Sequence, residues 1–280
     1  MAASRGISRS LGTMVAYGFA RGHLSSDLAL AARIGARCLE ILPDWRAFPD
    51  PAELRVQVAD AGLLVHSAHG CWGGQAIRAD RVDLGHSNPT IQQPGIGDLK
   101  RCIDWLADLG GTCLVVHPGG LSEPEQLEAR RATLAGGLVT LADHAQGTGV
   151  VVCVENMPPG VHPGSQMSDL AGLLRELNRP ELALAIDTGH ANMNSSAAAE
   201  TLAAGPLLST THVHDNNGHT DTHDPPGRGT VDWTAWLLAL DEIGYKGPVM
   251  LECIRHFREH PESLNEELFR LLERLTLDIR

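Results

Sequence analysis

The chain has very little lysine: Lys100 and Lys246 are the only two among its 280 residues. Its formal net charge is -12. A polyanion such as nucleic acid would therefore have to be held by a local cluster of arginines, against the overall field of the molecule. The composition weighs against nucleic acid as a partner.

Long apolar runs and targeting signals are also missing. No run approaches the ~20 residues that a membrane helix needs. The first residues, "MAASRGISRSLGTMVAYGF", lack the apolar core of a secretory signal. We therefore expect a cytoplasmic protein without a membrane segment. The six cysteines form no C-x-x-C pair, and four of them lie inside apolar runs, which indicates buried thiols.

Short apolar runs alternate about eight times with amphipathic stretches, and no linker or low-complexity segment interrupts the series. The runs are "MVAYGF", "RCLEILP", "LLVHSAHG", "TCLVVHPGG", "VVVCVENM", "LALAIDTGH", "STTHVHDN" and "PVMLECI". Nearly continuous apolar runs predict parallel strands buried on both faces. The stretches 98–111 and 232–247 have apolar residues at helical spacing and end at glycine, so we expect helices there.

This alternation predicts an α/β protein that forms a single (β/α)8 TIM barrel, with residues 1–280 as one domain. The chain is 43% hydrophobic and 20% charged, a composition that allows a large core. An open doubly wound sheet is less favoured, partly because no G-x-G-x-x-G follows any of the runs.

Six of the runs finish in an imidazole or a carboxylate. These residues are His66, His117, Glu155, Asp187, His212 and Glu252. In a barrel the strand ends converge on the C-terminal mouth, where the active sites of this fold lie. Any one of the six could be a loop cap, but six in register predict a shared site for a divalent ion such as Zn, Mn, Fe or Co.

Five motifs carry a family resemblance, and they span essentially the whole chain. They are "HPGG", "VENMPPG", "IDTGH", "HVHDNNGHTDTHDPPGRGTVDW" and "MLECI". In this order and spacing they resemble the xylose isomerase-like TIM-barrel superfamily. That group includes sugar and sugar-phosphate isomerases and epimerases, and also the apurinic endonucleases of the endonuclease IV type.

The two branches imply overlapping sets of ligands. Resemblance to the epimerases implies one Mn or similar ion, with Glu155 and Glu252 also acting as the acid/base pair. The matching ligands are Glu155, Asp187, His212 and Glu252. Resemblance to the endonucleases implies a three-zinc cluster that adds His66, His117, His190, Asp221 and His223. The expected cofactor is therefore Zn or Mn, with one to three ions.

Four other residues stay open between a site role and a structural one. His214 and Asp215 could orient metal ligands. Glu40 could reach the pocket or form a salt bridge inside the barrel, and Arg228 could hold a substrate phosphate or carboxylate. The strand-three ligand is open as well; His66 is favoured over His69 because it directly follows the apolar run.

Departures from the endonuclease pattern separate the two branches. The chain has "DTGH" and "HVHD" where the endonucleases usually have D-T-C-H and H-x-N-D, and Trp72 is its only candidate for a wedge into DNA. We therefore expect a metal-dependent isomerase or epimerase that acts on a small sugar or sugar phosphate through an enediolate, and a dehydratase would use the same chemistry.

The alternative is a zinc-dependent apurinic endonuclease or phosphoesterase, and a third class is a metal-bearing binding protein without turnover. A small carbohydrate is the expected partner, and a homo-oligomer is compatible with the sequence.

Overall fold

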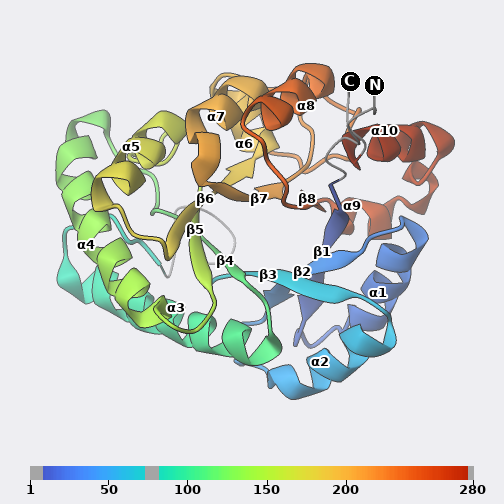
Figure 1. Ribbon diagram of the computed structural model, residues 1–280, viewed down its shortest axis with the longest axis horizontal. Coiled ribbons are helices and arrows are strands. Elements are labelled where there is room, and N and C mark those ends of the chain that lie inside the picture. Colours follow the sequence, from blue (N-terminus) through green and yellow to red (C-terminus); the bar gives the residue numbers. More distant parts are fainter. Residues whose placement is uncertain (1–8, 73–81, 277–280) are drawn as a thin grey trace, which may run out of the picture.

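The computed structural model describes residues 9–72 and 82–276, and its eight parallel strands form one sheet (Figure 1). The strands are β1 (Leu11–Tyr17), β2 (Cys38–Pro43), β3 (Leu64–His69), β4 (Cys113–Val116), β5 (Val151–Glu155), β6 (Leu182–Asp187), β7 (Leu208–His212) and β8 (Val249–Leu251). Their order is β7-β6-β5-β4-β3-β2-β1-β8. Just beyond β7, a parallel bridge joins Val213 to Leu251 and the Val213 N–H donates to Met250 O at 2.8 Å. These contacts bring β7 to β8, so the predicted (β/α)8 barrel is confirmed.

Helices surround the strands on the outside of the barrel (Figure 1). They are α1 (Leu24–Arg33), α2 (Pro51–Asp60), α3 (Pro89–Leu109), α4 (Leu127–Ala145), α5 (Met167–Leu177), α6 (Thr188–Asn194), α7 (Ala197–Ala204), α8 (Trp233–Glu242), α9 (Ile254–Glu259) and α10 (Glu266–Thr276). Within the described residues there are also three short 3-10 helices, η2 (Pro124–Gln126), η3 (Gly205–Leu207) and η4 (Pro261–Ser263).

The two helices expected from the sequence are present. α8 begins after Asp232, whose side chain caps the helix by accepting from the Ala235 N–H at 2.9 Å. α3 ends at Gly110, with φ at +86°, as the glycine stop predicted. It begins at Pro89, nine residues before the predicted stretch, because Asn88 caps it and proline is favoured at a first helical position.

Both faces of the strands are buried, and the inner face leads to the site. Cys113, Val115, Cys153, Ala183 and Ala185 form a small interior cluster, separate from the main core between strands and helices. Side chains two residues apart on a strand share a face. The next inward positions are His117, directly after β4, and Glu155 and Asp187, which end β5 and β6. These predicted ligands therefore lie at the C-terminal mouth of the barrel.

All six cysteines are free and buried, as the sequence predicted. Within the two described stretches, no helix is long and apolar enough to cross a membrane.

Candidate metal centre

Four residues from consecutive strands converge at the mouth. Glu155 and Asp187 end β5 and β6, His212 ends β7, and Glu252 directly follows β8. Each offers one ligand atom, and these four atoms all lie within 4.8 Å of one another. The Nδ1 atom of His212 is the centre of this group, at 2.9 Å from Glu155 Oε1 and 2.9 Å from Glu252 Oε2.

The buried oxygens of this group fit a divalent cation. Glu155 Oε2 and Glu252 Oε2 face histidine nitrogens, His117 Nε2 at 3.3 Å and His212 Nδ1 at 2.9 Å. Buried carboxylates are costly, so they are normally paired with a cation or a metal. Three carboxylates and one imidazole form a donor set that suits Zn or Mn. The four residues are therefore able to hold such an ion.

The charges of the group are strongly coupled. Burial alone would raise the pKa of the Glu155 carboxyl, but His212 and His117 hold it well below its usual value. Burial alone would lower the pKa of His212, but the carboxylates of Glu252, Glu40 and Glu155 raise it well above its usual value. The site therefore attracts positive charge, whether from protons or from a metal ion.

Asp187 is held in place by the elements on both sides of it. It caps α6, because its Oδ1 accepts from the His190 N–H at 2.7 Å. Its Oδ2 lies 3.0 Å from His214 Nε2. Asn156 clamps the backbone of Asp187 through two hydrogen bonds of 2.7 and 3.1 Å. The carboxylate is thus fixed before any ion binds.

A second group of ligand atoms lies beside Glu155, and here the sequence prediction needs correction. The group consists of His69, His117 and Glu155, with His117 Nε2 at 3.3 Å and His69 Nε2 at 3.8 Å from Glu155 Oε2. His69 occupies the place that the sequence analysis gave to His66. Burial, together with the neighbouring His117, lowers the pKa of His69 and favours the neutral ring that a metal requires.

A bulge in β3 explains why His66 is not in this group. Leu39 pairs with Val65, but Glu40 pairs with Ser67, so His66 is the extra residue of the strand. Its carbonyl accepts from the Thr112 N–H and its ring contacts Cys113, at the start of β4 and away from the mouth. β3 continues to His69 before the chain leaves the barrel.

A third group forms on the other side of the mouth from His190, Asp221 and His223. Asp221 Oδ2 lies 3.3 Å from His190 Nε2 and 3.2 Å from His223 Nε2. Burial alone would lower the pKa of His190, but the carboxylates of Asp187 and Asp221 raise it to about 10. The loop after β7 therefore brings Asp221 and His223 next to His190 of α6.

The residues that depart from the endonuclease pattern touch one another. A Cβ atom at Gly189 would lie 2.0 Å from His214 Cε1, so only glycine leaves room for this imidazole. His214 stacks on His223 at 4.0 Å between ring centroids, and its Nε2 contacts Asp187 Oδ2. His214 thus supports Asp187, and its ligand atom also groups with those of His223 and Glu252, so a supporting role and a ligand role both fit the structure.

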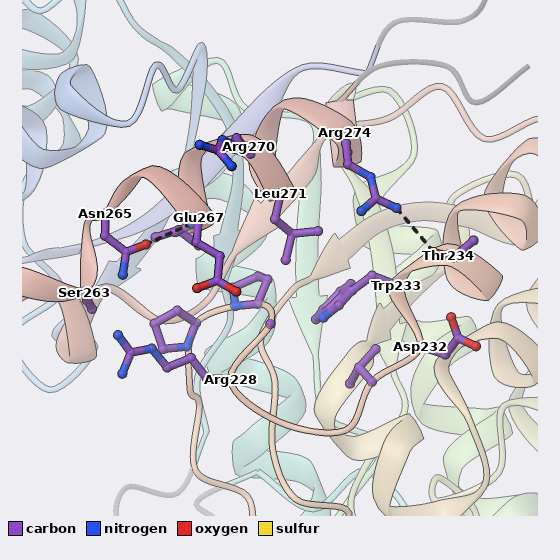
Figure 2. Close-up of a pocket in the computed structure, with 15 residues that line it drawn as sticks. Arg228, Asp232, Trp233, Thr234, Ser263, Asn265, Glu267, Arg270, Leu271 and Arg274 are labelled. Carbon is purple, nitrogen blue, oxygen red and sulfur yellow. Dashed lines mark hydrogen bonds between the residues drawn. The ribbon is translucent and has the colours of Figure 1, made fainter.

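Asp215 and Arg228 serve the loop rather than the mouth. The Asp215 carboxylate accepts from the backbone N–H groups of Asn216, Gly227 and Val231 and from Trp233 Nε1. Arg228 lines a separate pocket between this loop and α10, beside Trp233 and Leu271 (Figure 2). None of the predicted ligands lines that pocket. Another cavity is lined by Asp221, His223 and Glu252 together with residues of α9.

Residues 28–275 match the xylose isomerase-like TIM barrel family, and the chain belongs to this family. It is 30% identical to a ketose 3-epimerase of Arthrobacter globiformis over 223 residues, which are 75% of this chain and 72% of that protein. It is also 30% identical to an L-ribulose 3-epimerase of Methylomonas sp. over 235 residues, 80% of this chain and 76% of the relative.

Among solved structures, a D-tagatose 3-epimerase-like protein superimposes with a TM-score of 0.75 at 21% identity, covering 94% of this chain and 99% of that one.

Proposed function

We propose that this protein is a metal-dependent epimerase that inverts the carbon next to the carbonyl of a small ketose or ketose phosphate. The 3-epimerases among its relatives support an enzyme that acts on sugars. Glu155, Asp187, His212 and Glu252 would hold one divalent ion. Glu155 and Glu252 would also transfer the proton.

One observation carries the proposal. Glu155 and Glu252 come from β5 and β8, which are separated by two strands, yet both reach the same nitrogen of His212 at 2.9 Å. Two carboxylates that approach one point from different strands are suited to act on the two faces of a carbon atom bound between them.

The chemistry needs the removal and return of a single proton. A divalent ion, when bound, supplies positive charge beside the carbonyl and the neighbouring hydroxyl, which lowers the cost of ionising the intervening C–H bond. One glutamate accepts the proton from one face and the other glutamate donates a proton to the opposite face. The roles reverse for the opposite epimer.

Proton exchange with solvent tests the proposal. In deuterated water, a panel of ketoses and ketose phosphates should yield a substrate that gains deuterium at the carbon next to its carbonyl. Glu155→Gln and Glu252→Gln should each abolish epimerisation, and each should restrict exchange to the epimer whose proton faces the remaining glutamate. Metal content has to be measured in the same samples, because each change also removes a ligand charge.

Glu200→Gln is the matched control. Glu200 is also a buried carboxylate, but it accepts from the Met167 N–H and from Ser195, on the outer side of β6. This variant should keep full exchange. Epimerisation that persists in either active-site variant with metal still bound would contradict the proposed acid/base pair.

The endonuclease alternative makes a different prediction in the same assays. The ligand groups around His117 and His190 are compatible with additional zinc ions. The net charge of -12, however, opposes a DNA backbone, and binding would weaken steeply with salt. Efficient cleavage of abasic DNA at physiological salt, with no deuterium incorporation in any ketose, would replace the epimerase proposal.

A further inference from the structure

The proposed ligand set does not use Glu40, a fully buried carboxylate near the middle of β2. Two strands, β8 and β1, separate β2 from β7, so Glu40 meets the centre across the barrel interior. A charged side chain in such a place needs strong partners. Those partners therefore indicate what Glu40 does.

Both of its oxygens are engaged. Glu40 Oε1 lies 2.8 Å from His212 Nε2. Glu40 Oε2 accepts from the Ser67 hydroxyl at 2.5 Å. Ser67 is the residue that pairs with Glu40 on β3, directly after the bulge. The Oε2 atom of Glu40 is thus held by Ser67 of the neighbouring strand, and its Oε1 atom holds the imidazole of His212.

The contact determines which nitrogen of His212 remains available. A neutral imidazole has one N–H and one lone pair. Because Glu40 can only accept, Nε2 would keep its proton when an ion binds, and Nδ1 would be the nitrogen that offers its lone pair. Nδ1 is the atom that faces Glu155 and Glu252. A carboxylate on the far nitrogen also makes the imidazole a stronger donor to a metal.

We propose that Glu40, supported by Ser67, is the positioning residue of the metal centre: it fixes the orientation and tautomer of His212 so that Nδ1 points to the ion. This inference rests on the proposed metal centre. It assigns to β2 and β3 a role in metal binding although neither Glu40 nor Ser67 would touch the ion.

Metal affinity measured without substrate tests this role. Mn²⁺ binding is followed by calorimetry, and the visible spectrum of the Co²⁺-substituted protein reports the ligand geometry. Ligand-supporting residues typically contribute 10- to 100-fold to metal affinity, so we expect Glu40→Gln to weaken Mn²⁺ binding about 10-fold and Glu40→Ala about 100-fold. Ser67→Ala should weaken it less. The Co²⁺ spectrum should change in Glu40→Ala.

Glu200→Gln again serves as the control, and it should leave both the affinity and the spectrum unchanged. If Glu40→Ala does not fold, Glu40→Gln and Ser67→Ala decide the question, because both conserve the shape of the core. Excess Mn²⁺ should restore turnover to Glu40→Gln, since its acid/base pair is intact.

Two outcomes would overturn the inference, and they are distinguishable. Wild-type affinity and spectrum in folded Glu40 variants would show that this carboxylate only fills the core, while the metal centre itself would stand. A wild-type protein that binds no Mn²⁺, Co²⁺ or Zn²⁺ would contradict the metal centre and the positioning role together.

Discussion

Asp187 combines two tasks in one carboxylate: it caps α6 and it belongs to the central ligand group. Asp187→Asn keeps the size of the side chain but removes its charge. We expect this variant to lose the central ion and its turnover while the barrel stays folded, because strands on both sides hold the position. Elemental analysis and circular dichroism at room temperature check this. An unfolded variant would show that the residue is structural.

His190 gives the metal-free protein a defined pH dependence. Its pKa in the folded chain is about 10, against a usual value of about 6.5. The stability that its imidazolium provides is therefore fully present below about pH 6.5 and is lost as the pH rises through about 10. Urea midpoints of the metal-free protein should fall over this window, and His190→Asn should reduce the fall. Equal slopes in both proteins would contradict the shift.

The sequence predicted single residues well where they end a strand. Glu155, Asp187 and His212 occupy the last positions of β5, β6 and β7, as their place after apolar runs indicated. The preference for His66 over His69 was wrong, because His66 follows the apolar run in β3 without ending the strand. A bulge adds one residue there, and pairing with β2 and β4 carries the strand on to His69.

At the scale of elements, the start of α6 packs closely against the loop after β7. The contact is made by Gly189 of α6 and His214 of the loop. A methyl group at position 189 would overlap the His214 ring. Overpacking of this kind costs about 1–3 kcal/mol, so Gly189→Ala should destabilise the wild-type chain by about 2 kcal/mol. In the His214→Ala background the same change should cost close to nothing.

A double-mutant cycle from urea unfolding measures this coupling. Gly172→Ala is the control, because this glycine lies inside α5 and a Cβ there meets no atom within 4 Å. It should be neutral or stabilise the helix by about 1 kcal/mol or less. Equal costs of Gly189→Ala in both backgrounds would show that the two elements are not coupled through this contact.

For the whole molecule, the four overlapping groups of ligand atoms found among the described residues predict how many ions a chain can hold. If the groups centred on His117 and His190 bind metal in addition to the central four residues, elemental analysis should give two or three divalent ions per chain. His190→Ala and His223→Ala should then remove only part of the metal. A single ion that neither change affects would show that, of these groups, the central one alone binds metal.

The sequence by itself determined the barrel and the polar residues at the ends of β5, β6 and β7. Alternation of apolar runs with amphipathic stretches is a local property, and so is the residue at the end of each run. Only the tertiary structure decided which distant groups meet. Glu40 and His212 are 172 positions apart, and they touch because closure of the barrel places both side chains in its interior.

The contact between His190 and Asp221 also depends on the tertiary structure, because the loop after β7 has to return to α6 for the two side chains to meet. The bulge that selects His69 over His66 likewise follows from strand pairing. Contacts of this kind depend on the register of the closed sheet, and no local pattern of residues specifies that register.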